Sequence, residues 1–87
     1  MWSSFIEGES YFICTSTRYF VGRVVSKTQT DLLLEDAAWI VDTGRFHDFL
    51  KNGEPIECEP FIDPIIVPCH MVIDATKWRH KLPLEQK

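Results

Sequence analysis

Three consecutive residues near the start of the sequence, Arg18, Tyr19 and Phe20, combine a guanidinium with two aromatic rings. An arginine can form paired hydrogen bonds to phosphate oxygens, and an aromatic ring can stack on a nucleobase. This combination indicates a site for a flat, anionic ligand such as a nucleotide. Neighbouring residues of a strand point to opposite faces, so only one of the two rings can face such a ligand. Ordinary packing, with one ring in the core and one on the surface, is the competing interpretation.

A second group of candidate binding residues, Thr43, Gly44 and Arg45, lies where a short helix is expected to begin. Free N–H groups at a helix N-terminus attract anions, Gly44 permits close approach to the backbone, and Arg45 adds a positive charge. Asp42 opposes anion binding there, because its own carboxylate can occupy the helix terminus. A simply capped helix with Thr43 as the N-cap is the competing interpretation.

Arg23 and Trp39 complete the set of candidate ligand contacts. Arg23 follows Gly22 and would reach into a pocket, or else it is a solvated strand residue. Trp39 lies in an apolar run and is expected to belong mainly to the core, with its ring as a further candidate contact. The basic segment 77–81 would clamp phosphates, or it would pack Trp78 against a neighbouring subunit while its charges stay in water.

Catalytic and metal-binding motifs are missing from the sequence. The serines stand in no G-x-S-x-G elbow, and neither a Walker A loop nor a G-x-G-x-x-G motif is present. Cys69 and His70 are adjacent in an expected strand, where their side chains point apart and cannot form a nucleophile–base pair. The histidines and cysteines lack the paired short spacings of zinc sites. We therefore expect a binding protein that is not an enzyme and uses no cofactor.

Length and charge narrow the classes of function. The chain has 87 residues, 45% of them hydrophobic and 13% aromatic, which suits a single domain over residues 1–87. The formal net charge is −4, whereas proteins that bind nucleic-acid polymers usually carry a basic excess. A domain of this size has a small core, and assembly would bury more apolar surface, so we expect a homo-oligomer.

The cysteines and the N-terminal residues bear on the cellular compartment. Cys14, Cys58 and Cys69 are odd in number and widely spaced, so they are expected to be reduced and mostly buried. Residues 1–10 lack the basic region and apolar run of a secretory signal. No stretch approaches the roughly 20 apolar residues that cross a membrane. These features predict a cytoplasmic protein with no membrane partner.

The hydrophobic pattern predicts a mainly β (α+β) fold, a small antiparallel sheet that is rolled or half closed into a barrel. Runs at 11–15, 19–26 and 32–42 are rich in β-branched and aromatic residues and are separated by short polar segments, as in a β-meander. Gly22 within the second run predicts a bulge or a close approach of the backbone. Apolar, proline-interrupted runs at 55–61 and 65–74 predict further strands.

One short helix is expected at about 45–52. Phe46, Phe49 and Leu50 are spaced to share one helical face, and Gly53 followed by Pro55 is a typical helix stop.

The segment from Tyr11 to Lys81 carries a recognisable order of features. They are a strand ending in threonine and serine, an aromatic-x-Gly bend, an apolar run ending in Asp-Ala, a tryptophan, a glycine and a short amphipathic segment. The pieces are Thr15-Ser16, Phe20-Val21-Gly22, Leu33-Leu34-Glu35-Asp36-Ala37, Trp39-Ile40, Gly44, Phe49-Leu50 and the closing "PIIVPCHMVIDATKW". In this order of features the segment resembles the phage-encoded Thoeris anti-defence sponges and their small phage relatives.

Members of that family sequester cyclic nucleotide immune signals, without degrading them, in pockets between the protomers of homo-oligomers. The resemblance implies a ligand among cyclic ADP-ribose isomers and cyclic di- or trinucleotides, and inhibition of anti-phage defence in the bacterial cytoplasm. Related anti-CBASS sponges, which bind cyclic dinucleotides, fit a chain of this length equally well. Ala37-Ala38 stands where members commonly carry a basic pair, which removes one expected phosphate contact.

The expected roles follow from this resemblance together with the residue types. Tyr19 or Phe20 stacks a base, the three arginines at 18, 23 and 45 hold phosphates, and Thr43 and Gly44 offer hydroxyl or backbone contacts. The main alternative is a small β-domain that binds a host protein through an exposed strand edge and has no small-molecule ligand. A binder of single-stranded nucleic acid is a further alternative, against which the acidic balance argues.

Overall fold

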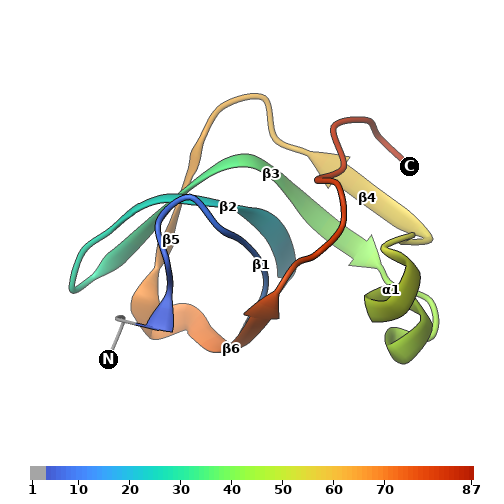
Figure 1. Ribbon diagram of the computed structural model, residues 1–87, viewed down its shortest axis with the longest axis horizontal. Helices are drawn as coiled ribbons and strands as arrows, with labels where there is room; N and C mark the ends of the chain where they lie inside the picture. The colour runs from blue at the N-terminus through green and yellow to red at the C-terminus, as the bar shows by residue number, and fades with distance from the viewer. Residues whose placement is uncertain (1–3) are drawn as a thin grey trace.

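The computed structural model describes residues 4–87, which form one antiparallel sheet of six strands and one short α-helix (Figure 1). The sheet is strongly curved and remains open, so the predicted mainly β fold with a half-rolled sheet is confirmed. The strands are β1 (Ser10–Thr15), β2 (Tyr19–Lys27), β3 (Asp31–Asp42), β4 (Glu57–Pro60), β5 (Ile65–Pro68) and β6 (Val72–Lys77). The helix α1 spans Phe46–Asn52, and a 3-10 turn, η2, spans Cys69–Met71.

The long strand β3 lies at the centre of the pairing. The strand order is β4–β3–β2–β1–β6, and β5 pairs with β3 as well. The first four residues of β3 face β5 and its last five face β4, so β5 and β4 share one side of β3 while β2 occupies the other. The expected meander of the first three strands is confirmed, because β1 pairs with β2 and β2 with β3.

A bulge interrupts the pairing of β2 with β3 beside Gly22. Val21 lies opposite Ala38 and Arg23 opposite Glu35, so β3 carries one extra residue at this point. Asp36 takes up the extra length with a φ of 50°, an uncommon conformation for a residue with a side chain. A Cβ on Gly22 would lie 3.1 Å from Cβ of Ala37, so both the predicted bulge and the predicted close approach are confirmed.

Two hydrophobic cores lie on opposite faces of the sheet. Strand β1 shows this most clearly, because Ile13 belongs to the first core and its neighbour Phe12 to the second. The first core fills the concave side of the sheet, and its buried members are Phe5, Tyr11, Ile13, Val24, Leu32, Leu34, Ala37, Val67 and Cys69. The second core lies between the sheet, α1 and the C-terminal segment, and its buried members are Phe12, Val21, Ala38, Ile40, Phe49, Cys58 and Trp78.

Helix α1 begins and ends close to the predicted residues, but its N-cap differs. Gly53 terminates the helix with a φ of 73°, and its N–H donates to the carbonyl of Phe49 at 2.8 Å, as expected for a glycine stop. The prediction of Thr43 as the N-cap is wrong. The N-cap is Arg45, which makes no side-chain capping bond, because the chain continues past Thr43 through a turn with Gly44 at a φ of 68°.

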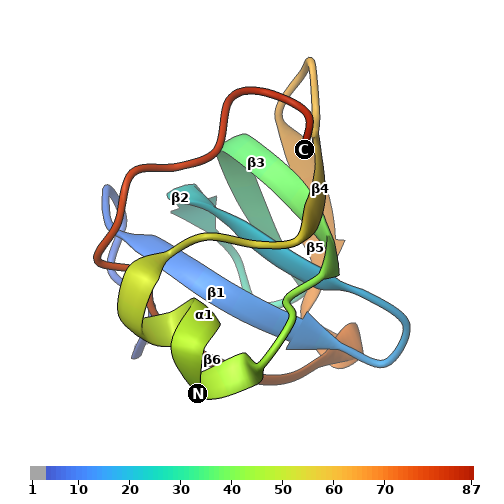
Figure 2. The same cartoon turned by 90° about the vertical axis from the view of Figure 1, so that its right-hand side faces the viewer.

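The C-terminal segment covers the second core and packs Trp78 within its own chain. The Trp78 ring lies 5.0 Å from that of Phe49, and its indole N–H donates to the carbonyl of Lys81 at 3.2 Å. The interpretation that Trp78 packs against a neighbouring subunit is therefore corrected, because α1 already buries it. Further along, Lys87 pairs with Cys58 through two backbone hydrogen bonds and covers the outer edge of β4. Figure 2 shows this segment beside β4 and α1.

Two smaller predictions concern the state of the cysteines and the presence of membrane-spanning segments. All three cysteines are free, with Cys58 and Cys69 buried and Cys14 partly buried, as predicted. Within residues 4–87, no helix has the length and apolar character that crossing a bilayer demands.

Candidate ligand site

Thr15 organises the tight loop that presents Arg18. Its hydroxyl oxygen accepts the N–H of Arg18 at 3.0 Å, and the hydroxyl donates to the carbonyl of Arg18 at 2.8 Å. The backbone N–H of Thr15 donates to the same carbonyl at 2.9 Å. Because Thr15 is buried, these bonds hold the backbone of Arg18 in one position at the mouth of the β1–β2 hairpin.

The guanidinium of Arg18 lies over two aromatic rings. Its central carbon is 6.0 Å from the ring centroid of Phe20 and 5.5 Å from that of Trp39. The two rings come together because Phe20 and Trp39 are paired across β2 and β3, and the bulge at Asp36 turns Trp39 toward the face that carries Phe20. Arg18 is exposed and forms no ion pair with any residue of the described range 4–87, so its N–H groups can contact a ligand.

A hollow of about 320 Å3 lies beside this cluster. It is lined by Thr17 and Arg18 on the hairpin loop, by the rings of Phe20 and Phe61, and by all four residues of β5. The lining is mostly apolar with one positive charge at the rim, and the volume is at the lower end of the range of about 300–1,000 Å3 that small-molecule pockets occupy. This hollow therefore suits a small ligand with a flat apolar part and one anionic group.

The structure separates the two aromatic rings of the opening triplet. Phe20 is 9% exposed and contacts Phe61, with ring centroids 6.0 Å apart, on the concave face. Tyr19 is 40% exposed and packs against Phe12 on the opposite face, 5.5 Å away. Only Phe20 therefore lines the hollow, while Tyr19 lies on the other side of the sheet.

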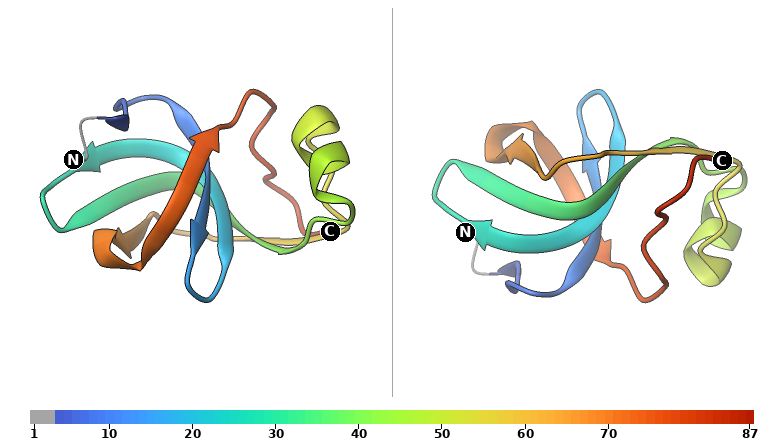
Figure 3. Two further views of the ribbon diagram at one scale, coloured as in Figure 1. Left: turned by 90° about the horizontal axis from the view of Figure 1, so that it is seen from below. Right: turned by 90° about the horizontal axis from the view of Figure 1, so that it is seen from above.

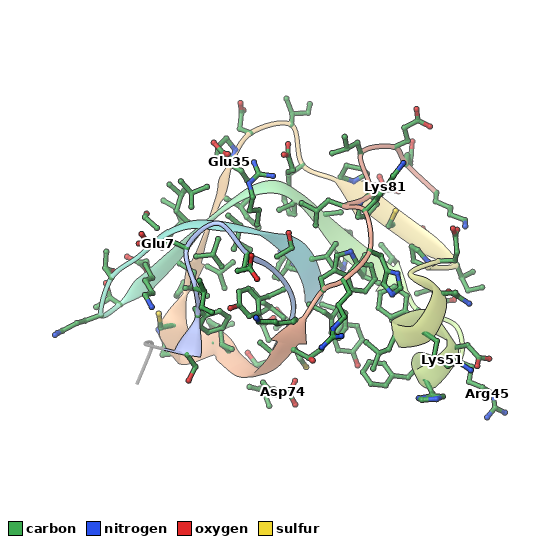
Figure 4. All side chains as sticks on the ribbon, in the orientation of Figure 1. Glu7, Glu35, Arg45, Lys51, Asp74 and Lys81 are labelled. Atoms are coloured by element: carbon green, nitrogen blue, oxygen red, sulfur yellow. The ribbon has the colours of Figure 1, made fainter. Side chains whose placement is uncertain are left out.

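Arg23 is held by two carboxylates. Its guanidinium forms ion pairs with Glu35 at 2.8 Å and with Asp36 at 2.9 Å, and these hydrogen bonds raise the pKa of Arg23. The bulge in β3 places both acids opposite Arg23. Figure 4 shows Glu35 on the upper side of the sheet, far from the end of the molecule where Arg45 lies. A phosphate at Arg23 would have to compete with two carboxylates already bound.

The residues that precede α1 bond to one another. The N–H of Gly44 donates to the carboxylate of Asp42 at 2.8 Å, and the Thr43 hydroxyl donates to the carbonyl of Gly44 at 2.8 Å. The carboxylate of Asp42 therefore already accepts the N–H of Gly44, which is the backbone donor predicted to bind an anion. Arg45 is exposed at the outer end of the molecule (Figure 4). Within residues 4–87 no hydrogen bond or ring contact joins these residues to Arg18, so one chain does not bring the two predicted groups together.

Two other kinds of site, a metal centre and a catalytic thiol, have little support within residues 4–87. No group of three or more His, Cys, Asp or Glu residues within 4–87 is arranged to hold a metal ion. Burial raises the pKa of the Cys14, Cys58 and Cys69 thiols, and neighbouring carboxylates act in the same direction on all three. These thiols are therefore poorly suited to act as nucleophiles at neutral pH.

The sequence pattern predicts Arg18 and Phe20 as ligand contacts but misses the other residues that line the hollow, of which Thr15 and Phe61 are the most informative. Thr15 has a recognisable signal, since a threonine before a short polar turn often hydrogen-bonds the backbone two or three residues later. Phe61 has none, because it reaches Phe20 only through the pairing of β3 with β4 and a hydrogen bond from its N–H to the carbonyl of Ala37.

Comparison of the chain with family models, with curated proteins and with solved structures finds no match. The resemblance to the anti-defence sponges therefore stays a prediction.

Proposed function

We propose that this protein binds a small cyclic nucleotide at Arg18 and sequesters it without cleaving it, the role that the resemblance to anti-defence sponges implies. In a phage-infected bacterium such binding would inhibit anti-phage signalling. The observation that carries the proposal is the guanidinium of Arg18, free of ion pairs in residues 4–87 and stacked over Phe20 and Trp39 beside an apolar hollow.

Arg18 itself supplies the stacking surface in this proposal. Its inner side covers the two rings, so a nucleobase would stack on its outer side or enter the hollow beside Phe20. A guanidinium is planar and stacks on flat rings, while its N–H edge binds phosphate oxygens. One residue can thus satisfy the base and the phosphate of a single nucleotide unit.

We assign the remaining predicted contacts, Thr43, Gly44 and Arg45, to a second copy of the chain. Arg45 extends into solvent from α1, with Thr43 and Gly44 close by in sequence, and none of them contacts Arg18 of the same chain. In a homo-oligomer, Arg45 of one protomer can reach the Arg18 site of another and hold a second phosphate. A ligand enclosed between protomers would suit a domain whose own hollow is small and open.

Calorimetric titration with a panel of cyclic ADP-ribose isomers, cyclic dinucleotides and cyclic trinucleotides tests this proposal. We expect saturable binding of at least one of them and recovery of the intact ligand after heat denaturation, identified by mass spectrometry. Arg18→Met keeps the aliphatic stem and removes the charge, and it should weaken binding about tenfold or more, since hydrogen bonds to charged groups are worth about 1.5–3 kcal/mol.

Arg79→Met is the matched control, because Arg79 is also exposed and lines no part of the hollow beside Arg18. Its affinity should equal that of the wild type. No binding across the panel would reject the proposal, and so would an equal loss of affinity in the two variants. Recovery of a cleaved ligand would replace sequestration by hydrolysis.

A further inference from the structure

A second hollow lies along β6 and contains none of the residues discussed so far as ligand contacts. It has a volume of about 980 Å3 and is lined by all six residues of β6, together with Phe5, Tyr11, Gln29 and Thr30. Phe5 and Tyr11 also belong to the concave core, so the floor of this hollow is apolar. Figure 3 shows β6 crossing the lower surface of the sheet, where no other described strand or helix covers it.

Strand β6 has one open edge within the part of the chain that the structure describes. It pairs only with β1, and the N–H of Trp78 donates to the carbonyl of Ser10 at 2.9 Å at the end of this ladder. Hydrogen bonds of an antiparallel pair alternate along the strand, so the backbone groups of Ala75 and Lys77 point away from β1. An open backbone edge beside a hollow for side chains is the arrangement that binds an extended peptide by strand addition.

The charges along this edge indicate what kind of peptide fits. Lys77 is paired with Glu9 at 3.5 Å, whereas Asp74 forms no ion pair within residues 4–87. Asp74 lies directly across from Cys14, so its side chain is on the face of the sheet opposite Tyr11 and Ile13, and it points away from the molecule (Figure 4). A partner strand on this edge would therefore gain an ion pair from a lysine or arginine on its outer face.

We propose that β6 binds an extended peptide as a seventh strand of the sheet. Apolar side chains at every second position of this peptide fill the hollow beside Phe5 and Tyr11, and a basic side chain on its other face pairs with Asp74. The proposal concerns a surface separate from Arg18 and does not depend on nucleotide binding.

A second copy of the chain fits this edge less well than a peptide does. If β6 paired with β6 of another copy about a two-fold axis, the two hollows would lie next to each other on the same face of a continuous sheet. Each hollow would then stay open, because the side chains that face it already belong to its own wall. A separate peptide can bring the apolar side chains that the hollow lacks.

A displayed library of seven-residue peptides tests the proposal. Its members alternate Val, Ile, Leu or Phe at the inner positions with Thr, Lys, Arg or Glu at the outer positions. Selection on the wild-type protein should enrich Lys or Arg at one outer position, and Asp74→Lys should enrich Glu there. For a selected basic peptide, Asp74→Lys should lower the affinity about twofold to fivefold, as for an exposed ion pair. Glu57→Lys on β4 makes the same charge change away from β6 and should leave the affinity unchanged.

Blocking the backbone edge distinguishes strand addition from other contacts. The selected peptide should shift the amide resonances of β6 and of the residues around the hollow, and N-methylation of the peptide amides on one edge should weaken binding at least tenfold. Ala75→Pro should have the same effect on the protein side, and the methylated peptide gives the same test if that variant does not fold. Arg18→Met should leave peptide binding unchanged.

Three results would overturn the proposal. The first is a selection that yields no peptide, and the second is binding that survives edge methylation. The third is a dimer of the wild-type protein that Ala75→Pro abolishes, which would assign the edge to a second copy.

Discussion

Replacing Gly53 by alanine is expected to destabilise the protein for two reasons that can be measured separately. Gly53 has a φ of 73°, and a side chain in this left-handed region costs about 1–2 kcal/mol. In addition, a Cβ at this position would lie 2.5 Å from Cγ and 2.7 Å from Cβ of His80. His80 would have to shift together with its backbone, because neither distance is compatible with a normal contact and a change of rotamer leaves Cβ in place.

The movement of His80 removes two contacts. Nε2 of His80 lies 2.9 Å from the carbonyl of Leu50, and a hydrogen bond of this kind is worth about 0.5–1.5 kcal/mol. The imidazole also packs edge-on against Trp78, with ring centroids 5.0 Å apart. With the backbone term, these losses predict a total decrease of about 2–4 kcal/mol in the free energy of unfolding.

Two comparisons separate the backbone cost at Gly53 from the cost of displacing His80. Gly8 has a φ of 92°, and a Cβ added to it would meet no atom within 4 Å, so Gly8→Ala should show only the backbone cost of about 1–2 kcal/mol. In a His80→Gly background, which removes both Cβ and Cγ, Gly53→Ala should likewise fall to the backbone cost alone. The double-mutant cycle should therefore give a coupling energy of about 1–2 kcal/mol between Gly53 and His80.

Urea denaturation followed by tryptophan fluorescence and circular dichroism supplies the free energies. The reasoning about His80 is wrong if Gly53→Ala is as harmful without His80 as with it. It is also wrong if Gly53→Ala is no more harmful than Gly8→Ala.

Two further predictions concern the triplet and the thiols. Phe20→Ala should lower the free energy of unfolding by about 3 kcal/mol and Tyr19→Ala by about 1 kcal/mol or less, because only Phe20 is buried. Urea denaturation measures both values. A larger loss for Tyr19→Ala than for Phe20→Ala would contradict the placement of the two rings. Burial raises the pKa of the Cys58 thiol, so the unfolded chain loses this proton at lower pH than the folded chain does. The contribution of Cys58 to stability should then be constant below the ordinary thiol pKa of about 8.5 and fall as the pH rises above it. Cys58→Ala should lose less stability than the wild type over that alkaline range under reducing conditions, and an equal loss would show that Cys58 does not contribute.

The local parts of the fold could be predicted from the sequence, because short-range patterns determine them. The meander at residues 10–42 follows from apolar runs separated by polar turns, and the stop at Gly53 follows from its tolerance of a positive φ. The prediction of Thr43 as the N-cap rests on residue type alone, and the turn at Gly44 moves the helix start two residues further. The sharing of β3 between β4 and β5 depends on contacts between distant segments, which no local pattern encodes.

The candidate site could be predicted only in part for a related reason. Arg18 and Phe20 are close in sequence, and Trp39 joins them through the register of β2 and β3. The same register, altered by one extra residue at Asp36, places two carboxylates on Arg23. A solvated arginine and an arginine held in two ion pairs look alike in the sequence, since the difference lies in which residues of β3 face β2.

The bulge at Asp36 has a consequence for how the protein unfolds. Before the bulge β3 contributes Leu32 and Leu34 to the concave core, and after it contributes Ala38 and Ile40 to the core beneath α1. One uninterrupted strand thus belongs to both cores, so the loss of β3 from the sheet would disrupt the packing of both. We therefore expect the two hydrophobic clusters to melt in one cooperative transition, and native-state hydrogen exchange should give the buried amides of both halves of β3 the same opening free energy.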